Sequence, residues 1–373
     1  MTTDTNSGFT IAAQPRVAAL VRLGGPKAGR LDKVRLDINE NVVGFSNRVV
    51  EEMLATVTPS FLSSYPEPGP LYEAIARLHD VDTKHVMVSG GSELAIRYVF
   101  ETYLGPDSEL VVLEPSFAMF AVYAQLLGAR VITVACSRQL TFSADDILES
   151  MSSRTRIVAI ANPNNPTGTV LSEPELLSII ERAASLGALV LVDEAYFYFY
   201  RGTMIPHVLQ KENLVVTRTF SKACGLASLR VGYAVGPKTI IAEVQKLQPI
   251  DHANGLAVLC GAYILDHLDL VWEYADQVEA GKRYLLEALA ELGLPAIGGH
   301  GNFVVMDFGS ERERVVSALR QDGILLGTWL RLPFENNYVR ATVGPVAQME
   351  VLVTALARHL AQAGSPRPAT GAV

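Results

Sequence analysis

The stretch Val86-Met87-Val88-Ser89-Gly90-Gly91-Ser92-Glu93 passes from a short apolar run through a glycine-rich turn into a segment with helical apolar spacing. This order of strand, turn and helix recurs as far as residue 235. The apolar runs are residues 86–88, 110–113, 131–134, 157–160, 189–192, 214–216 and 231–235. Near-continuous Val, Ile and Leu strands that alternate with helices are typical of a mainly parallel sheet covered on both faces. The sequence therefore predicts an α/β fold whose large domain contains a mainly parallel seven-stranded sheet covered by helices.

The pattern changes after residue 238, where a mostly helical stretch begins and reaches Leu292. The apolar runs 303–308, 324–326 and 338–341 then alternate with helices, which predicts a second, smaller α/β domain. We expect four parts: an N-terminal arm at residues 1–40 that joins the small domain, the large domain at 41–270, the small C-terminal domain at 271–362 and a disordered tail at 363–373. Gly, Pro and Ser in the tail favour disorder.

Composition and charge exclude several classes of protein. The net charge is −8 and the basic residues are scattered, so neither nucleic acid nor a membrane is an expected partner. The polar N-terminus lacks the order of a signal peptide, and no apolar run is long enough to span a bilayer. Three cysteines stand singly, which indicates reduced thiols of a cytoplasmic protein and no metal site.

Residues 217–230 carry a lysine with very few charged neighbours. They read Thr-Arg-Thr-Phe-Ser-Lys-Ala-Cys-Gly-Leu-Ala-Ser-Leu-Arg and follow the apolar run 214–216. Burial lowers a lysine pKa, and a neutral amine can form a Schiff base. A lysine whose ammonium group reaches water is the alternative, so this stretch alone does not identify Lys222 as catalytic.

Three more polar groups follow apolar strands of the predicted sheet. Residues 89–93 form a glycine turn that opens a helix, where backbone N–H groups and the helix dipole could hold a phosphate. Residues 162–168 form a proline-fixed loop that presents an asparagine amide. Residues 193–196 place a carboxylate after a fully apolar strand, where a cation must pair with it. Taken singly, each could be an ordinary turn, cap or ion pair.

Together these stretches resemble the pyridoxal-phosphate aminotransferases of fold type I, in the histidinol-phosphate aminotransferase branch. The resemblance covers about residues 34–345. The motifs that carry it are Asn39-Glu40-Asn41, Tyr65-Pro66, Gly91-Ser92, Glu114-Pro115-Ser116-Phe117, residues 162–168, Asp193-Glu194-Ala195-Tyr196, Ser221-Lys222, Arg230 and residues 339–344. The resemblance implies pyridoxal 5′-phosphate as cofactor, a homodimer, and transfer of an amino group between an amino acid or amine and a 2-oxo acid.

The resemblance also implies roles for single residues. Lys222 would form the Schiff base and move the proton as general base, and Asp193 would keep the ring nitrogen protonated. The other expected cofactor contacts are Asn165 and Tyr196 at the phenolic oxygen, Phe117 on the ring face, and Gly91, Ser92, Glu93, Ser221, Arg230 and the partner subunit's Tyr65 around the phosphate. Arg340 would bind the substrate carboxylate, with Asn39 beside it. A helix core position for Phe117 and a rim position for Arg340 remain open.

Departures from that branch concern the substrate. Histidinol-phosphate enzymes usually carry an arginine where this chain has Gly327. Its loss removes a partner for the substrate phosphate, unless Arg331 reaches into the site. Residues 23–26 replace a tyrosine that is common in the branch. Asp251-His252 stands where neutral polar or aromatic residues are usual, and an acidic group there could favour a cationic side chain. A solvated Asp251 at a helix start is the alternative.

Two other reactions share this fold and most of these cofactor residues. One is decarboxylation by an enzyme of the threonine-phosphate type. The other is elimination or cyclisation of a basic amino acid in specialised metabolism. The sequence does not show which Cα bond stands perpendicular to the cofactor ring, so both remain alternatives to transamination.

Overall fold

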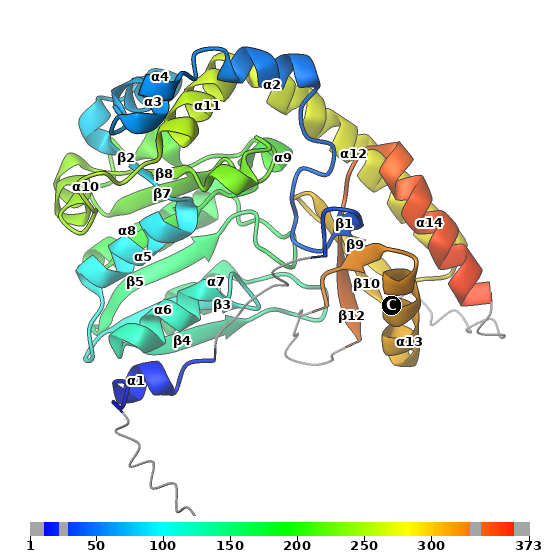
Figure 1. Cartoon of the computed structure of the whole chain (residues 1–373). Coiled ribbons are helices and arrows are strands. Elements are labelled where there is room, and N and C mark those ends of the chain that lie inside the picture. The colour runs from blue at the N-terminus through cyan, green and yellow to red at the C-terminus, as the bar shows by residue number, and fades with distance from the viewer. Residues whose placement is uncertain (1–10, 22–28, 329–336, 362–373) are drawn as a thin grey trace, which may run out of the picture.

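The computed structural model describes residues 11–21, 29–328 and 337–361 (Figure 1). Seven strands form its central sheet in the order β2-β8-β7-β6-β5-β3-β4. β8 runs antiparallel to both neighbours, and every other pair in this sheet is parallel. The strands are β2 (Val86–Ser89), β3 (Glu109–Glu114), β4 (Arg130–Ala135), β5 (Thr155–Ala161), β6 (Leu189–Asp193), β7 (Leu214–Thr219) and β8 (Gly232–Val235). The predicted seven-stranded, mainly parallel sheet is confirmed.

Helices cover both faces of this sheet because its strands bury apolar side chains on both sides. Val190 and Val192 of β6 point into one core, whereas Leu189 and Leu191 point into the other. One face carries α5 (Ser92–Tyr103), α6 (Met119–Leu127) and α10 (Lys238–Gln245); the other carries α4 (Gly69–His79), α7 (Ala144–Ser150), α8 (Glu173–Ser185) and α11 (Gly255–Asp266). The carboxyl ends of β5, β6 and β7 therefore lie side by side at one edge of a sheet whose two faces are covered by helices.

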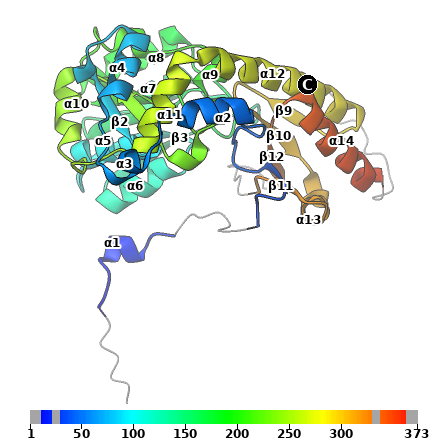
Figure 2. The ribbon, with the colours of Figure 1, turned by 45° about the horizontal axis from the view of Figure 1, so that its top comes forward.

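Two small sheets lie beside the large one (Figure 2). One is antiparallel and comprises β12 (Tyr338–Thr342), β10 (Phe303–Asp307) and β9 (Ala296–Gly298). The other pairs β1 (Val34–Leu36) in parallel with β11 (Ile324–Leu326). The long α12 (Leu268–Glu291), α13 (Arg312–Gln321) and α14 (Val346–Ala361) accompany them. The remaining helices are α1 (Pro15–Ala18), α2 (Asn47–Leu54), α3 (Pro59–Ser63) and α9 (Phe197–Tyr200). The N-terminal segment thus reaches the last third of the chain through β1.

Some sequence-based predictions fall outside the described residues. They concern the tail at residues 363–373, residues 23–26 and Arg331. Within the described ranges, no single helix is both long and apolar enough to cross a membrane. α11 and α12 would reach that length and composition only as a pair, and they are bent by 76° where they join.

Candidate active site

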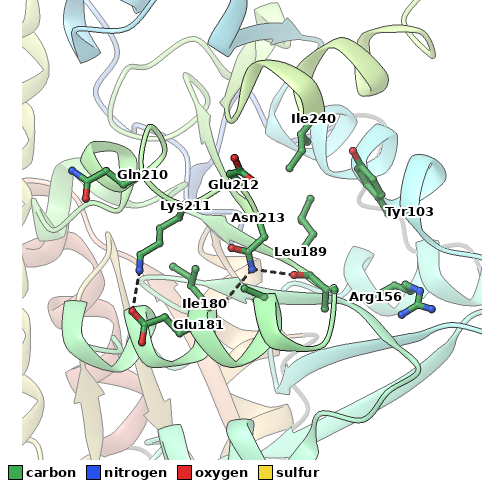
Figure 3. A pocket seen from close by; sticks show the side chains of 13 residues that line it. Tyr103, Arg156, Ile180, Glu181, Leu189, Gln210, Lys211, Glu212, Asn213 and Ile240 are labelled. Carbon is green, nitrogen blue, oxygen red and sulfur yellow. Dashed lines mark hydrogen bonds and ion pairs between the residues drawn. The ribbon is translucent and has the colours of Figure 1, made fainter.

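The amino ends and the carboxyl ends of the strands in the central sheet carry different groups. The amino ends of β5, β6 and β7 border a pocket of about 500 Å³ (Figure 3). Its polar side chains already have partners: Lys211 Nζ donates to Glu181 Oε1 over 2.9 Å, and the Asn213 amide donates to the backbone carbonyls of Ile180 in α8 and Ala188 just before β6. None of the predicted site residues lines this pocket. The opposite edge, at the carboxyl ends of the same strands, holds the groups described next.

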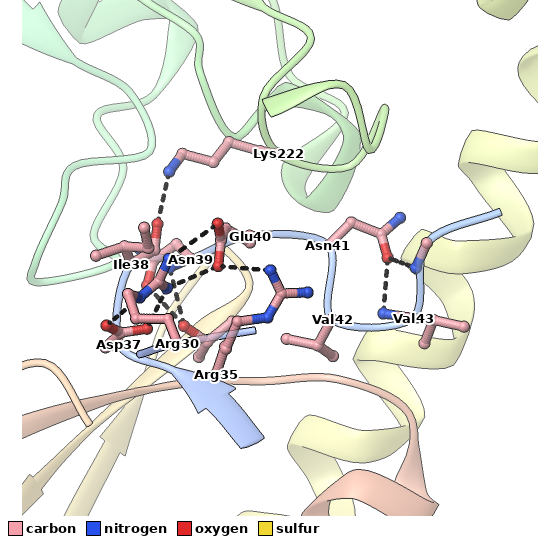
Figure 4. A network of polar contacts seen from close by, with 12 residues as sticks. Arg30, Arg35, Asp37, Ile38, Asn39, Glu40, Asn41, Val42, Val43 and Lys222 are labelled. Carbon is pink, nitrogen blue, oxygen red and sulfur yellow. Dashed lines mark hydrogen bonds and ion pairs between the residues drawn. The ribbon is translucent and has the colours of Figure 1, made fainter. Parts of the chain in front are cut away.

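Lys222 lies three residues after the end of β7, with its amine inside the protein. The amine donates a hydrogen bond of 2.9 Å to the carbonyl of Ile38 and lies 5.8 Å from the centre of the Tyr196 ring (Figure 4). Burial, and then the positive charge of Arg340, lower the lysine pKa to about 7. A large part of these amines is therefore neutral near neutral pH, which is the form that attacks a carbonyl or accepts a proton.

Asp193 is the last residue of β6, beside Thr217 of β7 in the register of the two strands. The hydroxyl of Thr217 donates to Asp193 Oδ1 over 2.8 Å. Burial raises the pKa of this carboxyl group to about 7, against the opposite effects of Thr217 and Lys222. A carboxylate in this position is costly without a cation, so the site favours a positively charged group beside Asp193.

A buried ion pair occupies the other face of the same two strand ends. Arg218 donates from Nε and Nη2 to Glu194 Oε2 over 3.0 and 2.8 Å, and both side chains are at most 4% exposed. Thr203 donates to the same carboxylate oxygen, and the backbone N–H of Met204 donates to the other. This pair was not predicted from the sequence, although an arginine within a buried strand was a signal for it.

Three elements converge where a phosphate could lie. The Arg230 guanidinium donates to Ser221 Oγ over 3.1 Å, and Gly91 precedes the first residue, Ser92, of the twelve-residue helix α5. Gly91 has φ +92°, and a Cβ atom there would lie 2.9 Å from Arg230 Nη2. Free backbone N–H groups, a helix dipole and a guanidinium are suitable partners for an anion. The Glu93 carboxylate faces elsewhere, since it accepts the hydroxyl of Tyr123 over 2.8 Å.

Arg340 lies in the middle of β12 and is 7% exposed. Nη1 donates to the side-chain oxygen of Asn165, and Nη2 donates to the carbonyl of Asp37 over 3.0 Å. Burial lowers the pKa of this guanidinium. Gly327 is its backbone partner, and a Cβ atom at Gly327 would lie 2.9 Å from the Asp37 carbonyl oxygen. A side chain at position 327 would therefore displace the backbone that holds Arg340.

Asn39 brings a second amide to the same centre. Its Nδ2 donates to the hydroxyl of Tyr196 over 2.9 Å, and its backbone N–H donates to Thr342 Oγ1 over 2.9 Å. The Tyr196 ring is buried against Phe303, edge to face at 5.1 Å. The structure thus brings together groups from β1, β6, β7, β10 and β12 around the lysine amine.

The sequence matches the family Aminotransferase class I and II over residues 32–356, which is most of the chain. The chain belongs to this family. As an aminotransferase of class I and II it is an enzyme whose family cofactor is pyridoxal 5′-phosphate, so the predicted reaction type and cofactor are confirmed.

Curated relatives of this aminotransferase include histidinol-phosphate aminotransferases. That of Symbiobacterium thermophilum is 33% identical over 341 residues, 90% of this chain and 92% of its own. That of Clostridium novyi is 29% identical over 320 residues, 85% of this chain and 88% of its own. The expected likeness to this branch is confirmed.

Solved structures share the fold. The histidinol-phosphate aminotransferase of Sinorhizobium meliloti, in complex with pyridoxal-5′-phosphate, aligns with a TM-score of 0.85 over 96% of this chain and all of its own, at 22% identity. The aspartate aminotransferase of Thermus thermophilus with maleate aligns with a TM-score of 0.78 over 94% of this chain and all of its own, at 21% identity.

Four predicted site residues of this aminotransferase lie away from the group around Lys222 or outside the described ranges. Tyr65 is 81% exposed on the loop between α3 and α4, and Asp251 is exposed before α11. His252 Nε2 lies 3.0 Å from the Tyr72 hydroxyl of α4. Among the described residues no hydrogen bond joins these side chains to that group. Arg331 is the fourth, and its position is not described.

Phe117 stands just before α6 and not within it, since the helix begins at Met119. The ring is half-buried and meets Phe120 edge to face at 5.5 Å between centroids. Phe117 therefore packs against the helix core without being part of the helix, and its stacking on the cofactor ring stays a prediction.

Proposed function

We propose that Lys222 of this aminotransferase binds pyridoxal 5′-phosphate as a Schiff base and that Asp193 pairs with the ring nitrogen. The observation that carries the proposal is the position of two side chains at the carboxyl ends of neighbouring strands: Asp193 is buried at the end of β6, and Lys222 follows β7 with its amine hydrogen-bonded to the Ile38 carbonyl. Burial moves the pKa of both groups to about 7. A protonated pyridine nitrogen supplies the cation that Asp193 requires. The bound cofactor would act as an electron sink for the bonds at the substrate Cα.

The phosphate of the cofactor would bind where Gly91, Ser221 and Arg230 come together. Ser221 and Arg230 already lie within 3.1 Å of each other, and the backbone at Gly91 leaves the space that a Cβ atom would fill. We assign the phosphate contacts to these residues together with the backbone of Ser92 and Glu93 at the start of α5. The Glu93 carboxylate is held by Tyr123, which keeps its negative charge directed away from the phosphate.

The contacts of the other side chains support the remaining roles. Lys222 Nζ would take the proton from the substrate Cα once its amine is free, since a base with a pKa of about 7 is matched to neutral pH. Arg340 would bind the substrate carboxylate with two N–H groups. Asn165, Tyr196 and Asn39 would orient the ring oxygen and the substrate, and Phe117 would cover the ring.

We propose that the amino group moves between an amino acid or amine and a 2-oxo acid, with a histidinol phosphate-like donor as the first candidate. The support is the identity of up to 33% with histidinol-phosphate aminotransferases over nearly the whole chain. A screen of amino donors with mass analysis of the products tests this. A keto product with an aminated cofactor supports transamination, whereas release of carbon dioxide indicates a decarboxylase.

The covalent role has a separate test. Borohydride reduction should fix the cofactor on the peptide that contains Lys222, and the Lys222→Ala protein should lose this attachment. Attachment that survives the substitution would refute the proposed role. Asp251 keeps its sequence-based hypothesis: Asp251→Asn should weaken a basic amino donor selectively, and unchanged selectivity would argue against it.

We also propose a homodimer in which Tyr65 completes the partner's phosphate site. Tyr65 is 81% exposed, and Leu62 on the preceding helix α3 is 65% exposed. A second copy would cover these apolar side chains. The test mixes Tyr65→Ala and Lys222→Ala proteins at limiting cofactor. Recovered activity supports a shared site, because one site of the mixed dimer then has both residues; no recovery contradicts it.

We also propose that domain boundaries lie at residues 40 and 270 and that the protein is cytoplasmic. Pairing of β1 with β11 supports the assignment of the N-terminal arm to the small domain. The three buried cysteines are free thiols, which suits a reducing compartment. Limited proteolysis and cell fractionation test the two statements.

A further inference from the structure

The segment at residues 37–40, directly after β1, supplies backbone acceptors to two of the proposed site residues; Figure 4 shows the segment with one of them, Lys222. The Ile38 carbonyl accepts the Lys222 amine over 2.9 Å. The adjacent Asp37 carbonyl accepts Arg340 Nη2 over 3.0 Å. Consecutive backbone oxygens therefore fix the separation between the proposed proton-transferring amine and the proposed carboxylate-binding guanidinium.

The conformation of this segment is one that a chain does not adopt without support. Asn39 has φ +58°, in the left-handed region that few residues other than glycine occupy. Its backbone and side chain are held by Thr342 and Tyr196, and Asn302 Nδ2 donates to its carbonyl over 3.2 Å. Such a turn persists only where surrounding contacts determine it.

Arg30 closes the segment from outside by bridging its two ends. Nε and Nη2 donate to the two carboxylate oxygens of Asp37 over 3.0 and 2.6 Å, and Nη2 also donates to Glu40 Oε2 over 2.8 Å. The side chains of Arg30, Asp37 and Glu40 are 15%, 5% and 18% exposed. An ion pair with this geometry and burial is not the screened surface type.

We propose that Arg30 is a positioning residue of the active site: by joining Asp37 to Glu40 it holds the two carbonyls that place Lys222 and Arg340. Arg30 also affects the charge near Lys222. The negative charge of Glu40 raises the pKa of Lys222, and the positive charge of Arg30 weakens this effect. The inference rests on the proposed roles of Lys222 and Arg340, and it adds a residue that contacts neither of them.

The test compares Arg30→Gln and Arg30→Lys with the matched control Arg35→Gln. Arg35 lies on β1, just before residues 37–40, and pairs with the same Glu40, but at 3.8 Å and with a side chain that is 30% exposed. Two readouts are taken on the holoenzymes: the KM for 2-oxoglutarate and pyruvate in single turnovers of the aminated form, and the pH titration of the visible absorption band.

Loss of the contacts that join Arg30 to Asp37 and Glu40 should misplace the Arg340 guanidinium, so both Arg30 variants should raise the KM about ten-fold or more. Arg30→Gln should also move the titration to higher pH, because Glu40 is then uncompensated, whereas Arg30→Lys should leave it near that of the wild type. Arg35→Gln should change neither quantity. Arg30→Lys keeps the positive charge and loses the two-point contact, so it distinguishes the effect of geometry from that of charge. If Arg30→Gln does not fold, the KM of Arg30→Lys alone tests the proposal.

A wild-type KM in Arg30→Lys would overturn the proposal, as would equal effects of Arg30→Gln and Arg35→Gln on both readouts. A loss of thermal stability alone would show a merely structural role and would also overturn it. Covalent attachment of the cofactor at Lys222 would still be intact in these cases, so failure here is distinct from failure of the proposed function.

Discussion

Replacement of Lys222 by methionine should stabilise the protein in the absence of cofactor. The amine titrates at about 7 in the folded state and at an ordinary 10.5 when exposed. The difference corresponds to a cost of about 5 kcal/mol for holding this group inside the protein, at about 1.4 kcal/mol per unit of pKa. Loss of the hydrogen bond to the Ile38 carbonyl offsets about 1 kcal/mol of the gain.

The sign of the pH dependence follows from proton counting. Between pH 7 and 10.5 the unfolded wild-type chain binds the proton that the folded protein releases, so wild-type stability rises with pH. The advantage of Lys222→Met should therefore be greatest at or below pH 7 and shrink by about 1.4 kcal/mol per pH unit towards pH 10.5. Urea unfolding of both proteins, freed of cofactor, at pH 7.5 and 9.5 measures it. An advantage that is absent, or equal at the two pH values, would refute the assignment of Lys222 as a buried, mainly neutral amine.

Three other substitutions test separate parts of the site. Gly91→Ala should weaken cofactor binding about ten-fold or more, because the new Cβ would lie 2.9 Å from Arg230 Nη2 and would displace the guanidinium from the proposed phosphate site; equilibrium dialysis of the cofactor measures it. Arg218→Met should lower the free energy of unfolding by about 3–5 kcal/mol in urea titrations, because it leaves the Glu194 carboxylate buried and unpaired. Arg340→Lys should raise the KM for 2-oxo acids about ten-fold, since a lysine cannot reproduce the two-point contact.

Each of these has a control or a contradicting outcome. Gly90→Ala should bind cofactor nearly normally, since Gly90 has no positive φ and its Cβ would meet the movable end of Leu94 at 3.3 Å. Combining Glu194→Gln with Arg218→Met should restore most of the stability, and a double variant as unstable as the single one would argue against an ion-pair effect. An Arg340→Lys enzyme with reduced turnover but unchanged KM would place Arg340 outside carboxylate binding.

The sequence could reveal residues whose signal is local. Asp193 follows the fully apolar run 189–192, and Lys222 comes soon after the apolar run 214–216, so both charged groups stand out without any knowledge of their neighbours. The parallel order of the strands then predicts that both lie at one edge of the sheet, and the structure has them there.

Other contacts depend on geometry that residue types do not encode. The pair between Arg218 and Glu194 needs the register of β6 against β7, and the oxygen that accepts Lys222 is a backbone atom of Ile38, an unremarkable residue in the sequence. The fork of Arg30 requires residues on both sides of β1 to fold back on each other. These features became visible only once the chain was placed in space.

The parallel pairing of β1 with β11 has a consequence for how the enzyme is made. Val34 pairs with Ile324, so the strand that leads into residues 37–40 emerges early from a ribosome and waits for its partner through most of translation. At about 5–20 residues per second the wait is on the order of tens of seconds. The seven-stranded sheet, with its lysine, can be assembled during that time. A nascent chain should therefore form its seven-stranded sheet well before residues 34–40 can settle beside it, and catalytic competence should appear abruptly, once β11 and β12 have been made.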